Sequence, residues 1–192
     1  MLVEKKRAFY PVFTNKKNEK LVFYPVKKNA NSSAKLFFVK HLGIEDKFYF
    51  LEDEKPRHLI TNLDYDKFKE KRNLMQLFVN NFKFQKVDIE IKACIIRDPL
   101  QRFVSAYKNR ILFHKDKEFY EHSVDQIIEK LESNLFENKH FIPQNYFLGD
   151  DLNYYNIVGL VSNISTFAAK INLFFDNKIP FPRIQTGGRS FT

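Results

Sequence analysis

The 192-residue sequence contains a single cysteine and five glycines, and no apolar run long enough to cross a bilayer. The lone cysteine, Cys94, excludes an internal disulfide, and its apolar neighbours indicate a small buried side chain. The first ten residues, "MLVEKKRAFY", carry charges where a secretory signal would have its apolar core. We therefore expect a cytoplasmic protein with no transmembrane segment, and leave attachment to a membrane surface open.

The composition is that of a folded domain, with 44% hydrophobic residues and 22 phenylalanines. The length predicts one domain over residues 1–192. Because its last residues, "FPRIQTGGRSFT", read as a loop, the chain is expected to be cut short at the C-terminus. The net charge of +9 indicates an anionic partner or ligand, without deciding among nucleotide, glycan, nucleic acid and membrane.

Strand patterns alternate with helix patterns along the chain. A β-hairpin is expected over 8–26, with further strands at 47–54, 89–97 and 154–161, and helices at 32–42, 64–82, 99–111, 123–133 and 163–175. The run "IEIKACIIR" (89–97) is apolar and β-branched, as expected of a strand buried on both faces. This alternation predicts a three-layer α/β domain whose central, mainly parallel sheet is flanked by helices.

Several residues are expected to mark helix ends. Ser32 or Ser33 would cap the first helix and Gly43 would follow its end, Asp98 would cap a helix that begins at Pro99, and Ser123 would cap another. In the helix after Pro99 the pattern predicts an apolar face and an opposite polar face. The apolar face would comprise Leu100, Phe103, Val104, Tyr107 and Ile111, and the polar face Gln101, Arg102, Ser105, Lys108 and Asn109.

A strand, a polar loop and a helix succeed one another in "FYPVKKNANSSAKLFF" (23–38). Such a junction can bind a phosphate, because the free N–H groups and the dipole of the helix start favour an anion. Lys28 would add a mobile charge, and residues 29–33 would supply backbone amides and the two serine hydroxyls. Since the loop contains no glycine, a plain polar connection is the alternative.

A second junction of the same kind follows the strand at 89–97. Arg97 ends that strand, and Ser105 lies two turns into the next helix. The two side chains could converge on one anion, for which the fork of an arginine is well suited. The alternative is that Arg97 pairs with an acidic neighbour and Ser105 lies on the surface.

Together the two junctions resemble the sulfotransferase family. "KNANSS" (28–33) is similar to its 5′-phosphosulfate loop, and "IIRDPLQRFVSAY" (95–107) is very similar to its 3′-phosphate element. "KHFIPQ" (139–144) and "YYNIVGLVSNISTFAAKI" (154–171) resemble later segments of the carbohydrate sulfotransferases, a group with Golgi and bacterial members. The resemblance implies a P-loop-like fold and transfer of a sulfuryl group from 3′-phosphoadenosine 5′-phosphosulfate (PAPS) to a hydroxyl or amine, here that of a carbohydrate.

The resemblance also implies roles for individual residues. Lys28 would stabilise charge on the leaving phosphate oxygen, and Arg97 and Ser105 would hold the 3′-phosphate. The rest of the cradle would be Lys27, Asn29, Ala30, Asn31, Ser32 and Ser33, with Lys27 able to share or replace the role of Lys28. His140 and Gln144 would line the acceptor or cofactor pocket, and Lys108 could bind an acidic glycan. No metal is expected, and no metal-ligand spacing is evident.

The acceptor hydroxyl needs a general base, for which a histidine of near-neutral pKa is suited. His58 in "KPRHLITNL" is the first choice, because "RHL" resembles a His-Leu pair of cytosolic sulfotransferases. Glu52 and Glu54 are the alternatives. His41 lies close to the end of a helix, where a positively charged residue interacts favourably with the helix dipole, and this is its expected role. His114 and His122 are expected to lie on the surface.

Other functions remain open at this point. A P-loop kinase or NTPase would show G-x-x-x-x-G-K-[ST], which is absent. A nucleic-acid-binding module would show a basic helix, zinc spacing or an aromatic sheet signature, and none is clear. A catalytically inactive sulfotransferase fold is the third alternative.

Overall fold

The computed structural model describes residues 12–43, 91–133, 138 and 140–183. The expected strand 47–54 and helix 64–82 lie outside these ranges. The described elements are β1 (Val12–Thr14), β2 (Lys20–Tyr24), α1 (Asn31–His41), β3 (Ile91–Ile96), α4 (Pro99–Tyr107), the π-helix η3 (Lys108–Phe113), α5 (Val124–Ser133), α6 (Gln144–Leu148), the short 3₁₀ helix η4 (Leu152–Tyr154), β4 (Ile157–Leu160) and α7 (Ile164–Phe175).

The described strands form one sheet in the order β1-β2-β3-β4. β1 and β2 are the expected antiparallel hairpin, while β2, β3 and β4 run parallel, with Tyr24 beside Cys94 and Ile96 beside Leu160. β3 is central, and Ala93, Cys94 and Ile95 are buried on its two faces. The prediction of a mainly parallel sheet with a doubly buried strand is therefore confirmed.

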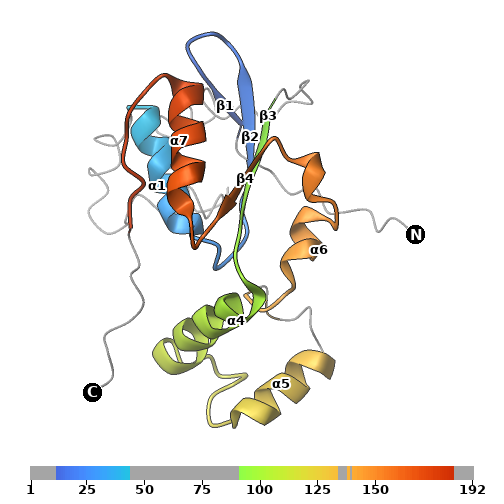
Figure 1. Cartoon of the computed structure of the whole chain (residues 1–192). Helices are drawn as coiled ribbons and strands as arrows, with labels where there is room; N and C mark the ends of the chain where they lie inside the picture. The colour runs from blue at the N-terminus through green and yellow to red at the C-terminus, as the bar shows by residue number, and fades with distance from the viewer. Residues whose placement is uncertain (1–11, 44–90, 134–137, 139, 184–192) are drawn as a thin grey trace, which may run out of the picture.

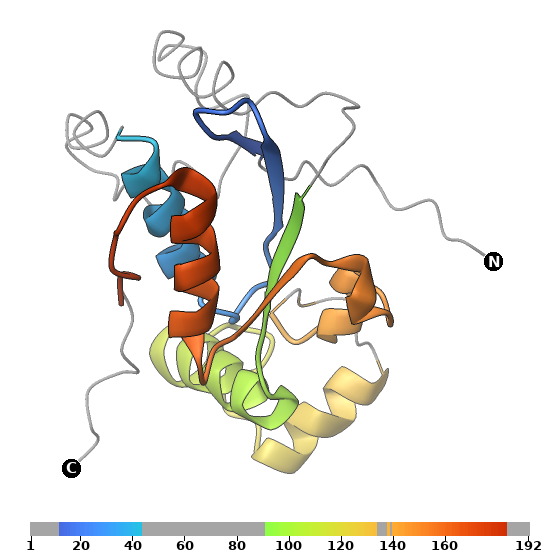
Figure 2. The same cartoon turned by 45° about the horizontal axis from the view of Figure 1, so that its top comes forward.

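Helices cover both faces of the sheet (Figure 1). On one face α1 and α7 lie side by side over a core rich in phenylalanine, a packing that Figure 2 shows from above. On the other face α6 packs through Leu148 against Val26, Cys94 and Tyr155. This three-layer α/β arrangement, with its P-loop-like architecture, is the predicted fold class. Burial raises the pKa of Cys94 to about 12, which agrees with its expected role as a packing residue.

α4, η3 and α5 extend from the end of the sheet where the parallel strands finish (Figure 1). These helices and the segment between η3 and α5 pack together through a small apolar cluster formed by Ile111, Phe119, Ile127 and Leu131. Asp98 caps α4 by accepting a hydrogen bond from the Gln101 amide, as predicted. Ser123 caps α5 in a reciprocal capping box with Gln126.

Three expectations about helices are wrong. α1 begins at Asn31 behind Ala30, whose backbone is left-handed and makes no side-chain cap, so Ser32 and Ser33 lie inside the first turn. In α4 the expected apolar face fails, since Leu100 and Val104 are exposed while Arg102 is only 5% exposed. His41 stacks on Phe175, and burial lowers its pKa to about 4, so it is neutral rather than a cation at the helix end.

Candidate functional site

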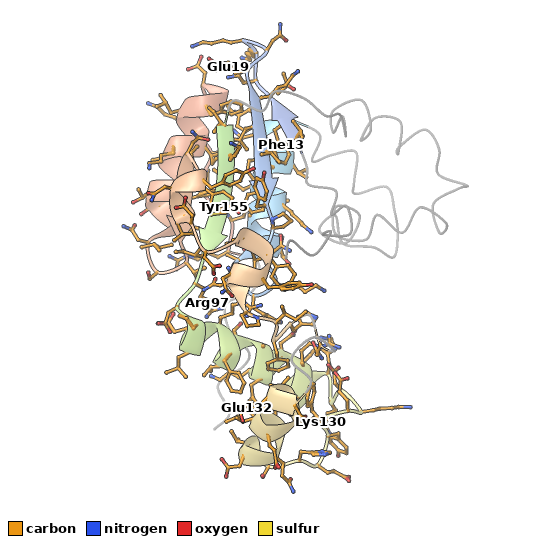
Figure 3. The ribbon with its side chains drawn as sticks, turned by 90° about the vertical axis from the view of Figure 1, so that its right-hand side faces the viewer. Phe13, Glu19, Arg97, Lys130, Glu132 and Tyr155 are labelled. Carbon is orange, nitrogen blue, oxygen red and sulfur yellow. The ribbon has the colours of Figure 1, made fainter. Side chains whose placement is uncertain are left out.

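The two predicted junctions meet at one edge of the sheet. β2 and β3 are parallel neighbours, so the loop after Tyr24 and the turn after Ile96 leave the sheet side by side. Figure 3 shows Arg97 at the point where the sheet meets α4. The convergence expected from the sequence is therefore present.

The loop between β2 and α1 has two residues with left-handed backbones, Lys28 (φ 69°) and Ala30 (φ 54°). Such conformations are unfavourable for residues with a side chain and persist only where the surroundings hold them. The residue between them, Asn29, supplies that hold: it is buried, and its Nδ2 donates to the carbonyl of Ile95 (2.8 Å) and to Oε1 of Gln144 (2.8 Å). An asparagine anchor thus maintains a loop geometry that glycines often provide elsewhere.

Two arginines hold successive carbonyl groups of this loop. Arg97 Nη1 donates to the carbonyl of Lys28 (3.1 Å), and Arg102 Nε donates to the carbonyl of Lys27 (3.0 Å). In a trans peptide the carbonyl and the following N–H point in opposite directions. The N–H of Lys28 therefore points away from Arg102.

The amides of this loop fall into two groups. The N–H of Asn29 closes a turn on the carbonyl of Val26. Within the described residues, the N–H groups of Lys28, Ala30, Asn31 and Ser32 have no recorded acceptor. The last two belong to the first turn of α1, where helix geometry leaves amides without partners. Loop and helix start together form a cradle of N–H groups suited to an anion.

The side chain of Lys28 reaches across to η3, where its amine donates to Oδ1 of Asn109. Its pKa is lowered to about 8, first by burial and then by the positive charges of Arg110, Lys27 and Arg97, with Asp116 acting in the opposite direction. A second amine, that of Lys35 in α1, is buried, and burial together with Lys27 lowers its pKa to about 7. A bound anion would stabilise the charged forms of both amines and so raise their pKa values.

The cluster carries more positive than negative charge. Arg110 makes two hydrogen bonds of 2.6 Å to Asp116, and Asp98, the cap of α4, is exposed. Burial lowers the pKa values of Arg97 and Arg102, because it disfavours their charged forms. In the described part of the chain, Nε of Arg97 and Nη2 of Arg102 are buried donors without an acceptor. Unpaired guanidinium groups of this kind fit phosphate or sulfate oxygens.

Ser105 is half-buried on α4, between Arg102 and Asn109 along the helix. Residues three and four apart share a helix face, and both of these neighbours contact the loop. Ser105 therefore lies on the side of α4 that faces the loop.

Gln144 lies at the start of α6 and is part of the framework. Its Nε2 donates to the carbonyl of Arg97 (2.6 Å), and its Oε1 accepts from the Arg97 amide (3.2 Å) and from Asn29. Its side chain thus joins the two junctions. In the described structure these bonds give Gln144 a framework role at the candidate site.

The remaining predicted residues lie around this centre or outside the described ranges. His140 lies in the turn before α6, where its amide donates to Oδ1 of Asn138. Lys108 is exposed at the start of η3. His58, Glu52 and Glu54 lie outside the described residues.

Sequence reasoning gave no role to Arg102 and Asn109, which it had placed on the polar face of the helix. The available signal was their spacing from Ser105, since all three occupy one side of α4 and its π-helical continuation. The described ranges contain no group of three or more His, Cys, Asp or Glu side chains able to hold a metal. Among the helices in those ranges, none combines the length and hydrophobicity needed to span a membrane.

Comparison with known proteins agrees with this geometry. No curated protein and no solved structure matches the chain. The family model described as "Sulfotransferase family" matches residues 11–185 and so includes both junctions, Gln144 and α7. A cradle of backbone amides, a half-buried lysine and two arginines with buried, unpaired donor atoms accompany that match, and the chain belongs to the sulfotransferase family.

Proposed function

We propose that this protein transfers the sulfuryl group of PAPS to a hydroxyl or amine of a carbohydrate. The observation that carries the proposal is the convergence of the 27–33 cradle with Arg97 and α4 at one sheet edge. PAPS has two anionic ends, a 5′-phosphosulfate and a 3′-phosphate, and the two junctions offer a site for each. The family match supports sulfuryl transfer in general, and the carbohydrate acceptor rests on the resemblance of residues 95–107 and 139–144.

The proposed roles of the residues are those that the family resemblance implies. Amides and hydroxyls of 29–33 take the 5′-phosphosulfate, while Arg97 and Ser105 take the 3′-phosphate. Lys28 compensates charge that develops on the leaving phosphate oxygen, a contribution that grows toward the transition state. The amine of Lys28, held by Asn109 in the free protein, is chosen on its spacing in the loop. This choice gives Lys28 the catalytic role ahead of Lys27.

Calorimetry with adenosine 3′,5′-bisphosphate tests the donor site. Binding without added metal is expected for the wild type, with affinity reduced by about tenfold or more in Arg97→Ala, since a charge-assisted contact is lost. Because Arg97 also holds the Lys28 carbonyl, Ser105→Ala serves as a milder second variant. Absence of wild-type binding, or unchanged affinity in both variants, would refute the donor assignment. Binding of ATP that requires Mg²⁺ would favour an NTPase instead.

A transfer assay with sulfur-labelled PAPS and a panel of glycans tests the acceptor and the lysines. Lys28→Ala is expected to reduce turnover more than Lys27→Ala, and the reverse order would assign the catalytic role to Lys27. We propose His58 as the general base, with Glu52 and Glu54 as alternatives. His58→Ala should then remove the acidic limb of the pH–rate profile, whereas retention of that limb would favour a glutamate.

A further inference from the structure

Arg102 is a buried cation whose bonded partner is a neutral group. Its side chain lies on α4 with 5% exposure, and its recorded hydrogen bond runs from Nε to the carbonyl of Lys27. Arginine is rarely buried without a carboxylate, because desolvating the guanidinium is costly. Within the described residues no carboxylate is recorded at hydrogen-bond distance from Arg102, and its Nη2 is buried without an acceptor.

The start of helix α4 fixes the backbone position of Arg102. Asp98 and Pro99 set the start of α4, and the Asp98 carbonyl accepts from the Arg102 amide (2.8 Å). The loop at the other end of the contact is anchored at Asn29, but Lys28 and Ala30 on either side have left-handed backbones, which further contacts must hold. A planar guanidinium on a fixed helix can set the direction of a loop carbonyl, which a flexible ammonium does less well.

We propose that Arg102 is a positioning residue for the 5′-phosphosulfate cradle. By holding the carbonyl of Lys27 it turns the Lys28 amide, in the same peptide plane, toward the bound 5′ group. Arg97 holds the next carbonyl, that of Lys28, in the same way. The inference rests on the proposed function, since it assumes that the cradle takes the 5′ end of the donor.

Three nucleotides distinguish positioning of the cradle from a general contribution to folding. Adenosine 3′,5′-bisphosphate occupies both phosphate sites, adenosine 5′-monophosphate only the cradle, and adenosine 3′-monophosphate only the site of Arg97 and Ser105. Arg102→Met retains the apolar stem of the side chain and removes its donors. It should weaken the bisphosphate and the 5′-monophosphate by about tenfold and leave the 3′-monophosphate within about twofold.

Two control variants complete the calorimetric experiment. Ser105→Ala should show the opposite selectivity, with losses for the bisphosphate and the 3′-monophosphate and none for the 5′-monophosphate. Arg183→Met removes the same charge from an exposed position and should leave the affinities for all three nucleotides unchanged. If Arg102→Met does not fold, Arg102→Lys, which retains the charge, should give the same selective pattern with a smaller loss.

The outcomes separate this inference from the proposed function. An equal loss for the 3′- and 5′-monophosphates in the Arg102 variants, or no loss at all, overturns the positioning role. Wild-type protein that binds none of the three nucleotides, or binds the bisphosphate no better than either monophosphate, contradicts the proposed function. A loss confined to ligands with a 5′-phosphate supports both.

Discussion

At the scale of single residues, the unusual environment of Lys28 makes ligand binding dependent on pH. Its pKa is lowered to about 8 by burial and by the neighbouring cations. A bound phosphate stabilises the charged amine and raises that pKa again. The amine therefore takes up a proton on binding, wherever the free protein is partly deprotonated.

This linkage predicts the pH dependence of adenosine 3′,5′-bisphosphate binding. The contribution of Lys28 is complete below its free pKa of about 8 and is lost as the pH rises above it. Calorimetry at pH 8 in two buffers of different ionisation enthalpy should detect uptake of about half a proton by Lys28. Lys28→Met should abolish that component, whereas uptake by Lys35, whose pKa is about 7, would persist.

Asn109→Asp provides a contrasting variant for the same measurement. It places a carboxylate where the Lys28 amine now donates to an amide oxygen, so the pKa of Lys28 should rise and the proton uptake should move to higher pH. An unchanged pH profile in both Lys28→Met and Asn109→Asp would show that Lys28 does not sense the ligand.

His41 makes the stability of the fold pH-dependent. Its ring lies 4.6 Å from the rings of both Phe37 and Phe175, and burial lowers its pKa to about 4, against 6.5 when unfolded. The unfolded chain therefore binds the proton more tightly, and stability is lost as the pH falls from about 6.5 toward 4. In thermal denaturation, the loss between pH 7 and 5 should be smaller for His41→Leu. An equal loss would locate the acid sensitivity elsewhere.

Candidate site residues were recognisable in the sequence where a side chain would act through its own chemistry. Lys28, Arg97 and Ser105 were predicted from charge and spacing, and the structure brings their elements together. Arg102 was placed on the polar face of its helix without a role, because its burial depends on a loop some seventy residues earlier in the chain. Helix periodicity describes one helix and contains no information about what packs on it.

At the scale of secondary-structure elements, β4 and α7 pack closely at Gly159. A Cβ added there would lie 2.7 Å from Cδ2 of Phe167, well inside contact distance. Gly159→Ala should therefore lower the free energy of unfolding by about 1–3 kcal/mol, a cost typical of overpacking. Urea denaturation would measure this loss.

A double variant tests the cause of that loss. Gly159→Ala combined with Phe167→Leu should be more stable than the sum of the two single changes predicts, because the smaller side chain makes room for the methyl group. Strict additivity would show that the strain at Gly159 does not come from Phe167.

Some helix boundaries are set by neighbouring residues and could be predicted from the sequence, whereas others are set by distant contacts. Asp98 and Ser123 were predicted as caps and are caps, since capping depends on neighbouring amides. Ser32 and Ser33 are not caps, because Asn29, anchored to β3 and α6, sets where α1 begins. The π-helix η3, which directs Asn109 toward Lys28, had no recognised signal in the sequence.

At the scale of the whole molecule, the candidate site joins parts of the chain that are distant in sequence. The loop before α1, the start of α4 and the start of α6 meet through Asn29, Arg97 and Gln144. A ligand held between these parts stabilises the folded state and has no comparable site in the unfolded chain. Binding should therefore stabilise the whole molecule against unfolding.

Binding of the nucleotide should therefore raise the melting temperature of the protein. Adenosine 3′,5′-bisphosphate at one hundred times its dissociation constant should add about 2.7 kcal/mol, or roughly 5–10 °C for a protein of this size. Adenosine, which lacks both phosphates, should produce almost no shift. Equal shifts with both compounds would indicate recognition of the base alone.

The sequence by itself determined the three-layer α/β class, the central strand β3, most of the described helices and the two strand-to-helix junctions of the candidate site, because these follow from local periodicity and local motifs. The tertiary structure alone decided that two arginines hold the carbonyls of Lys27 and Lys28, that Gln144 joins the junctions, and that His41 is neutral. The physical reason is that hydrogen-bond geometry and desolvation depend on which distant residues share a space. Only folding brings those residues together.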